Sequence, residues 1–383
     1  MLFTQATILA LTILAAAHPG HEETEHLQAV KARAARTNTK RALEGCTSQL
    51  EAQGVHARAM ERRKTTFDAQ RMAKGIPLDT PHAMINGRRT KRDTPDVLNK
   101  NHQGGIDAFQ AWVDESYVFN DTTSTVLNPE GDIGPFYVPG EYIRSMLCTN
   151  DDCPDGVFVV ADIQFINVDT CEPLADVWAD VWSCNATGEY SGIQSGRNGN
   201  PSDAENLNNT ALRGLQKSDP DGVVQFWYTF PGHYTGRTNH QHIMVHENAT
   251  VLPNGTLAGD GSVCHIGQLF WDQDLIDEVE TWSPYTENTA LPTLNSEDSV
   301  FGEQETADTD SDPVYSYTWF GEDVGLGIFA WTVIGIDPSA SYTPTYSFAL
   351  TEGGGIAVGN NGEGGGPPGG LRGPGRPPSS ALY

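Results

Sequence analysis

Basic residues are scarce over most of this 383-residue chain. Residues 105–351 contain 5 Lys and Arg against 38 Asp and Glu, which gives a net charge of −33. So few cations cannot neutralise the phosphates of a nucleic acid, and we therefore expect no nucleic-acid partner. Beyond its N-terminus the chain also lacks any stretch of about 20 apolar residues, the length that spans a bilayer. We expect no membrane partner either.

The positive charge gathers near the N-terminus. Residues 18–104 contain 16 Lys and Arg against 10 Asp and Glu, a net charge of +6. Such a break predicts separate segments: a basic helical extension or pro-region at 18–104, a main domain at 105–351, and a disordered tail rich in Gly and Pro at 352–383. Two helices are expected in the extension, with a break near Gly45 or Gly54.

The first 17 residues form a short apolar run that ends in small residues. Although it has no basic start, this run fits a secretory signal peptide at 1–17, cleaved before His18. Six cysteines in an exported chain predict disulfides, with fifteen connectivities open for three bridges. A secreted, extracellular protein is therefore expected. Five Asn-x-Ser/Thr sequons fit a glycosylated surface, and they start at Asn120, Asn185, Asn208, Asn248 and Asn254.

Between the extensions, short alternating segments predict β-strands. Residues 157–169 alternate apolar and polar side chains as a half-buried strand would, and residues 175–183 follow the same pattern. A third strand is expected at 223–230, after the sequence Asp-Pro-Asp-Gly at 219–222. The two aspartates could bind calcium, but we interpret them as a tight turn. Short strands separated by turns predict a mainly β fold, namely a β-sandwich.

Residues 231–242 combine a Tyr, an Arg and a His-x-His pair within a short span. His240 and His242 are two apart, so on a strand both side chains point to one face, with Cα atoms roughly 6.6 Å apart. That spacing suits two imidazoles bound to one metal ion at about 2.1 Å. His246 shares the face, but on a straight strand it lies about 20 Å from His240. We interpret it as a surface or core histidine.

A second motif lies about fifty residues upstream and ends in Asn185-Ala-Thr-Gly-Glu-Tyr190. With this motif the chain resembles the intradiol ring-cleavage dioxygenases, which bind Fe(III) through two tyrosinates and two histidines. The family pattern has an apolar strand ending in Val-Trp, then an Asn, a Gly and a ligand Tyr. A Pro-Gly-x-Tyr supplies the second Tyr, and Arg-x-x-His-x-His completes the set. The resemblance covers roughly residues 125–350 and implies a β-sandwich with the metal held by loops and strand ends.

The resemblance also implies a role for individual residues. Arg237 and Gln268 match the family's active-site arginine and glutamine. Pro135 and Tyr137, in a Gly-Pro-Phe-Tyr-Val segment, are similar to residues beside the substrate pocket. One Fe(III) per chain is expected, with four protein ligands: Tyr190, Tyr234, His240 and His242.

The order of the residues raises one geometric question. Arg237 is three residues before His240, an offset that would place it on the opposite face of a regular strand. It can reach the metal side only if Gly236 breaks that regularity. Tyr234 is expected to be the labile ligand and to act as a base.

The implied reaction is cleavage of a catechol-type ring by O₂ between its two hydroxylated carbons, giving a muconate-type diacid. Neutral catechols are expected, because few cations are available to bind a substrate carboxylate; Arg144 is the one candidate near the Gly-Pro-Phe-Tyr segment. Both extensions are expected to be dispensable for iron binding. Two alternatives stay open: a secreted β-sandwich binding module without turnover, and a zinc or copper protein that uses the His pair. The sequence also leaves an oligomer open.

Overall fold

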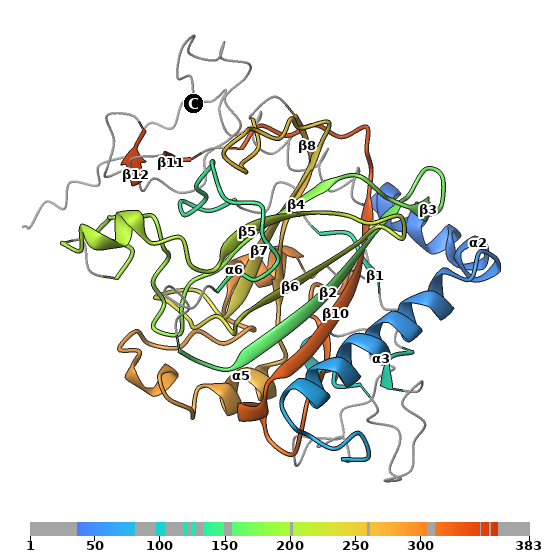
Figure 1. Ribbon diagram of the computed structural model, residues 1–383, viewed down its shortest axis with the longest axis horizontal. Coiled ribbons are helices and arrows are strands. Elements are labelled where there is room, and N and C mark those ends of the chain that lie inside the picture. The colour runs from blue at the N-terminus through green and yellow to red at the C-terminus, as the bar shows by residue number, and fades with distance from the viewer. Residues whose placement is uncertain are drawn as a thin grey trace, which may run out of the picture.

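In the computed structural model, the protein is built around two β-sheets that pack face to face (Figure 1). This architecture agrees with the predicted mainly β sandwich. The structure describes residues 37–80, 97–104, 118–120, 124–127, 133–148, 155–199, 202–258, 261–304, 311–344, 346–351 and 354–358. The expected signal peptide and most of the expected tail lie outside these residues.

The larger sheet has six strands. Its two central strands, β2 (Phe158–Asn167) and β10 (Ile328–Ile336), run parallel to each other. β2 and β6 fall within the strands predicted at 157–169 and 223–230. The outer strands are β1 (Ser124–Thr125), β3 (Glu172–Pro173), β6 (Val223–Thr229) and β9 (Ser316–Trp319).

The smaller sheet is antiparallel, and its outer face carries the histidine pair, His240 and His242. Alternation along its strands sends Val181 of β4 and Ile243 of β7 into the core between the sheets, while Trp182 and His242 point away from that core. β4 falls within the strand predicted at 175–183. In spatial order the strands are β5 (Arg213–Lys217), β4 (Trp178–Trp182), β7 (His240–Glu247) and β8 (Ser262–Phe270).

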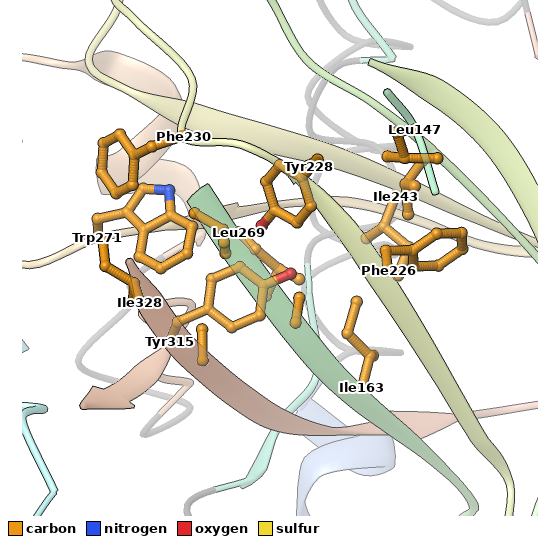
Figure 2. Packing of buried hydrophobic residues seen from close by; sticks show 14 of the residues in the cluster. Leu147, Ile163, Phe226, Tyr228, Phe230, Ile243, Leu269, Trp271, Tyr315 and Ile328 are labelled. Atoms are coloured by element: carbon orange, nitrogen blue, oxygen red, sulfur yellow. The ribbon is translucent and has the colours of Figure 1, made fainter. Parts of the chain in front are cut away.

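The core between the sheets is rich in aromatic side chains (Figure 2). Trp271 stacks on Tyr315 with ring centroids 4.7 Å apart. The hydroxyls of Tyr315 and Tyr228 both donate to Oε1 of Gln241, at 2.7 and 3.2 Å. Gln241 lies between the two histidines of β7, so this buried network fixes the backbone from which they project.

Helix α3 (Val55–Ala73) covers the outer face of the larger sheet (Figure 1). Its Arg62 forms two hydrogen bonds, at 2.8 and 2.9 Å, with the carboxylate of Asp162 in β2. The sequence predicts β2 to be half-buried, but the helix buries its second face as well, and Asp162 is 0% exposed. Although the net charge of the chain changes sign near residue 104, the helix that precedes this point packs directly against the main domain.

A disulfide ties the helical segment to the sheet. Cys46 bonds to Cys171 at 1.97 Å, across a sequence separation of 125 residues. Gly54, with φ of +69°, separates α2 (Thr47–Ala52) from α3, which agrees with the predicted break. Within the described part of the chain, Cys184 and Cys264 form no disulfide.

The remaining elements are short helices and a separate two-stranded sheet. One of them corrects the expected tail boundary: residues 354–357 form a strand, which pairs with 348–351. The predicted turn is confirmed, because Oδ1 of Asp219 accepts the N–H groups of Asp221 and Val223 at 2.9 Å. None of the helices described is long and apolar enough to cross a membrane. These elements are η1 (Val97–Asn99), η2 (Glu205–Asn208), α5 (Gln273–Val279), η3 (Tyr285–Glu287), α6 (Ser299–Gln304), η4 (Val324–Leu326), β11 (Phe348–Thr351) and β12 (Gly354–Ala357).

Candidate metal centre

Two phenol oxygens and two imidazole nitrogens converge at one end of the smaller sheet. The Nε2 atoms of His240 and His242 are 3.2 Å apart. The hydroxyl of Tyr190 lies 3.3 Å from the first of these nitrogens and 3.1 Å from the second. The hydroxyl of Tyr234 lies 3.4 Å from Nε2 of His240. The structure thus brings together the four side chains that the resemblance names as metal ligands.

Strand pairing explains why both histidines reach this cluster. His240 and His242 are the first and third residues of β7, so their side chains leave the sheet on the same face. Across the sheet, His242 pairs with Trp182 in β4 and with Gln268 in β8. The indole of Trp182 stacks on the imidazole of His242 with ring centroids 4.8 Å apart and an interplanar angle of 6°. This stacking fixes the plane of the imidazole.

Two loops bring the tyrosines to the sheet, and we call them the Tyr190 loop (185–198) and the Tyr234 loop (231–239). A glycine in each motif lets the loops meet. A Cβ atom on Gly188 would lie 2.3 Å from a carbonyl oxygen of the Tyr234 loop, and one on Gly232 would lie 2.2 Å from a carbonyl oxygen of the Tyr190 loop. Both approaches are too close for any side chain, so only glycine allows this backbone packing.

Tyr190 is fully buried and its backbone is held on both sides. Its N–H donates to Oδ1 of Asn198 at 2.7 Å, and its carbonyl oxygen accepts from Nδ2 of the same side chain at 2.7 Å. Nδ2 of Asn206 donates to that carbonyl at 2.9 Å. Phe136 stacks on the Tyr190 ring with centroids 4.6 Å apart. The position of the Tyr190 phenol is therefore set by residues close to it in the sequence, mainly Asn198 and Asn206.

Tyr234 is half-buried and lies in a tight turn. Its carbonyl oxygen accepts the N–H of Arg237 at 3.0 Å, and Gly236 within the turn has φ of +82°. The turn brings Arg237 back over the loop, where one amino group donates to the Tyr234 hydroxyl at 3.3 Å and the other donates to Oε1 of Gln268. Because β7 begins only at His240, the face rule for strands does not apply to Arg237.

The nitrogen of His240 that faces the cluster is unprotonated. Nδ1 of His240 lies 2.6 Å from the carbonyl oxygen of Thr238, which can only accept, so Nδ1 carries the proton and Nε2 presents a lone pair. Burial, together with the neighbouring Arg237, lowers the pKa of His240 to about 3. Burial likewise lowers the pKa of His242 well below its ordinary value. Both imidazoles are thus in the neutral form that binds metals.

Two carboxylates beside the Tyr234 loop, the buried Asp298 and the half-buried Glu280, were not singled out from the sequence. Oδ2 of Asp298 accepts from Nε of Arg237 at 2.9 Å. Oε1 of Glu280 accepts from Nδ2 of Asn239 at 2.9 Å and lies 2.8 Å from Nδ1 of His233. Burial by itself would raise the pKa of Asp298, but the adjacent guanidinium holds it below its ordinary value. Asp298 is 61 residues from its partner, and no local pattern links them.

The donor set fits a metal ion. Donors bonded at about 2.1 Å to one ion lie about 3.0–3.4 Å apart when the bonds meet at about 90–110°, and the four distances in the cluster are 3.1, 3.2, 3.3 and 3.4 Å. Once the phenols are deprotonated, two phenolates and two neutral imidazoles would all present lone pairs to one cation. Burial raises the pKa of Tyr190 well above its ordinary value, and a bound cation would reverse that preference.

The cluster differs in composition from the usual zinc sites. Among the residues described, no group of three or more His, Cys, Asp or Glu side chains is arranged to hold a metal. His246 lies at the far end of β7, with Nε2 3.5 Å from Oδ2 of Asp180, which agrees with its interpretation as a histidine apart from the cluster. His246 therefore does not supply the third ligand of a three-histidine zinc site.

Pro135 and Tyr137, the two residues expected beside the substrate, lie differently relative to the four donors. Pro135 is exposed and follows Gly134, at which a Cβ atom would lie 3.3 Å from Cε1 of His242. Tyr137 points away from the donors: its ring packs on Trp182 at 5.0 Å and its hydroxyl donates to Asp180 at 3.3 Å. The intervening Phe136 contacts both phenol rings instead, at 4.6 and 5.6 Å. A substrate role for Pro135 and Tyr137 stays a prediction.

The structure is similar to solved structures of intradiol dioxygenases. One is an intradiol ring-cleavage dioxygenase from Tetranychus urticae, with 24% identity over 58% of this chain and 98% of the other, and a TM-score of 0.44. Another is a hydroxyquinol 1,2-dioxygenase from Pseudomonas putida DLL-E4, with 20% identity over 61% of this chain and 70% of the other, and a TM-score of 0.35. The first carries the name of the family that the two sequence motifs resemble.

No family model and no curated protein matches the chain. Because the two solved structures have low sequence identity and low TM-scores, a function can be proposed only from the residues of the site itself.

Proposed function

We propose that the protein is a secreted non-haem Fe(III) dioxygenase that cleaves catechol-type rings between the two hydroxylated carbons, using O₂. The observation that supports it most is the convergence of two phenols and two neutral imidazoles within 3.1–3.4 Å. Phenolates are hard, anionic donors, a set that favours Fe(III) over the softer divalent ions. Tyr190, Tyr234, His240 and His242 would hold one ion per chain.

Bound iron supplies a Lewis acid that holds both phenolic oxygens of a catechol and tunes its ring toward O₂. The two tyrosines have different parts in this scheme. Tyr190 is buried and braced, so it acts as the fixed ligand. Tyr234 is half-buried, and the guanidinium of Arg237 beside its hydroxyl stabilises the phenolate form. A phenolate at this position is suited to accept a proton from an incoming catechol.

Arg237 and Gln268 form the polar wall next to Tyr234. The guanidinium reaches both the Tyr234 hydroxyl and Oε1 of Gln268, so its charge lies beside the ring of a substrate bound at the cluster. A fixed cation in a water-poor site stabilises negative charge that develops on the ring more strongly than water does. Phe136 supplies an apolar surface against the two phenols.

The substrate proposed is a neutral catechol, of hydroxyquinol or plant-phenol type, because the other cations of the main domain are engaged elsewhere or exposed. Arg213 comes nearest to the donors, with its guanidinium 5.9 Å from the centroid of the Tyr190 ring. Arg144 donates to the carbonyl oxygens of Arg213, at 2.9 Å, and of Thr210. Arg213 is paired with the buried carboxylate of Glu141 at 3.0 Å. The other two, Arg197 and Lys217, are exposed. A substrate carboxylate would therefore lack a partner.

Secretion belongs to the same proposal. The signal-like residues 1–17 and the five sequons support it, and so does the Cys46–Cys171 disulfide, since such bonds persist mainly in oxidising compartments. Mass spectrometry of protein collected from the culture medium of a eukaryotic host tests it. The expected species starts at His18 and carries N-linked glycans. Full retention inside the cell with residues 1–17 attached would contradict secretion.

The activity is tested with the purified full chain. We expect one iron per chain by elemental analysis, a visible tyrosinate-to-iron absorption band, and oxygen uptake with catechol or hydroxyquinol that exceeds uptake with protocatechuate. Iron with the band but no uptake with any catechol would favour the binding module. Zinc or copper in place of iron, without the band, would favour the alternative of a zinc or copper protein that uses the His pair. Protocatechuate as the best substrate would contradict the proposed preference.

A further inference from the structure

One segment far from the motifs, residues 280–298, holds the Tyr234 loop along much of its length. Nδ2 of Asn288 donates to the carbonyl oxygen of His233 at 2.8 Å. At the other end of the loop, the hydroxyl of Thr238 donates to Oδ1 of Asn295 at 2.8 Å. Of the residues in this segment that contact the Tyr234 loop, only Asp298 bonds the side chain of Arg237, to which the proposed function gives a part in the reaction.

Asp298 has both carboxylate oxygens engaged. Oδ2 accepts from Nε of Arg237 at 2.9 Å and from the N–H of Thr238 at 2.8 Å. Oδ1 accepts from the N–H groups of Val300 and Phe301, at 2.8 and 3.0 Å, at the start of α6. The side chain of Asp298 is 0% exposed and that of Arg237 is 12% exposed, so neither charge is compensated by bulk water.

A guanidinium is planar, so a bond at Nε sets the direction of both amino groups. With Nε directed to Asp298, one amino group faces the Tyr234 hydroxyl and the other faces Gln268. We propose that Asp298 is a positioning residue that fixes the guanidinium of Arg237 between Tyr234 and Gln268. This role rests on the proposed function for the part that Arg237 has in the reaction.

Asp298 also caps α6, and that contact alone could explain its burial. The two roles use different oxygens, so two substitutions separate them. Asp298→Ser keeps an N-cap side chain for α6 but removes the acceptor for Arg237. Val300→Ala weakens the packing of α6 in its apolar cluster and leaves Asp298 and Arg237 in place. It is the matched control for a general loss of stability in this segment.

The experiment compares these variants in two backgrounds, with Arg237 and with Arg237→Ala. In the first, Asp298→Ser is expected to lower kcat/KM about 10–100-fold, mainly through kcat, with iron content and visible band unchanged. In the second, it should have no further effect on kcat/KM, because the group it positions is gone. Val300→Ala should lower the melting temperature but leave kcat/KM within about twofold.

A crystal structure of Asp298→Ser adds a readout that does not depend on activity. The guanidinium of Arg237 is expected to leave its position between Tyr234 and Gln268. An unchanged guanidinium would overturn the positioning role, and so would a full loss of kcat/KM that persists in the Arg237→Ala background. If the wild-type protein cleaves no catechol, the proposed function fails, while the crystal structure still decides whether Asp298 sets the guanidinium. If Asp298→Ser does not fold, Asp298→Asn takes its place in both arms.

Discussion

The two loops that supply the tyrosines are held in different ways. The Tyr190 loop is braced mainly from nearby in the sequence, by Asn198 and Asn206, which bond directly to the backbone of Tyr190 itself. The Tyr234 loop is held by the distant segment 280–298, whose contacts reach the neighbours of Tyr234 at positions 233 and 237–239.

This difference supports the separate roles proposed for the two phenols. A ligand that must stay bound benefits from direct bonds at its own backbone and from full burial. A ligand that must exchange with a substrate needs neighbours that are fixed and a side chain with room to move. Tyr190 meets the first description and Tyr234, half-buried in a turn, meets the second.

Loss of the fixed phenol is expected to have the largest effect. Tyr190→Phe removes an anionic donor from the centre of the cluster, so most of the iron and the visible band should be lost. Elemental analysis and absorption spectroscopy measure both. Tyr317→Phe, which removes another buried hydroxyl, from β9 of the larger sheet, is the control and should keep the iron. Full iron and an intact band in Tyr190→Phe would refute the assignment of Tyr190 as a ligand.

Loss of the labile phenol should separate binding from turnover. Tyr234→Phe leaves three donors and the braces of Tyr190 in place, so we expect most of the iron to be retained with a shifted visible band. Removal of a proton acceptor typically costs about 10²–10⁴-fold in rate, and kcat for catechol cleavage is expected to fall in that range. If Tyr234→Phe and Tyr190→Phe lose iron equally, the two phenols have no separate roles.

The sequence predicted those parts of the site that depend on local patterns. The spacing of His240 and His242 fixes one face of a strand, and that geometry is found. The glycines of both tyrosine motifs are explained by the close approach of the two loops. Asp298 and Glu280 were missed because their partners are distant in the sequence, and a buried carboxylate gives no local signal. The buried outer face of β2 was missed for the same reason, since α3 covers it from a different segment.

The brace on Tyr190 should matter for metal affinity. Asn198→Ala leaves the N–H of Tyr190 without its partner, and each buried group left unpaired costs about 1–3 kcal/mol. Nδ2 of Asn206 still reaches the Tyr190 carbonyl, so the fold should survive. We expect a loss of about 10–100-fold in iron affinity, measured by competition with a chelator. Asn167→Ala, which removes a similar side-chain bond to a backbone N–H at the end of β2, is the control. Unchanged affinity in Asn198→Ala would mean that the brace does not position the ligand.

A change in a buried cluster of charged side chains around His102 is expected to have the smallest effect on the metal centre. His102 lies between two carboxylates, with Nδ1 2.5 Å from Asp272 and Nε2 2.9 Å from Asp312, and Lys100 also pairs with Asp312, at 2.6 Å. Burial alone would lower the pKa of His102, but the two carboxylates raise it to about 10. Asp272 precedes α5, which leads into residues 280–298.

The sign of the pH dependence follows from that shift. The folded pKa of His102, about 10, lies above the ordinary value of 6.5, so its stabilising contribution is complete below about pH 6.5 and is lost as pH rises toward 10. The free energy of unfolding, measured by urea denaturation, should therefore fall between pH 7 and 10 in the wild type. In His102→Gln it should be lower at pH 7 and nearly flat over the same range. His56→Gln, on the surface of α3, is the control and should keep the wild-type slope. Since none of the contacts described joins this cluster to a metal donor, the visible band at pH 7 should stay unchanged in His102→Gln. A free energy of unfolding that stays flat between pH 7 and 10 in the wild type would show that His102 is not held in the charged form.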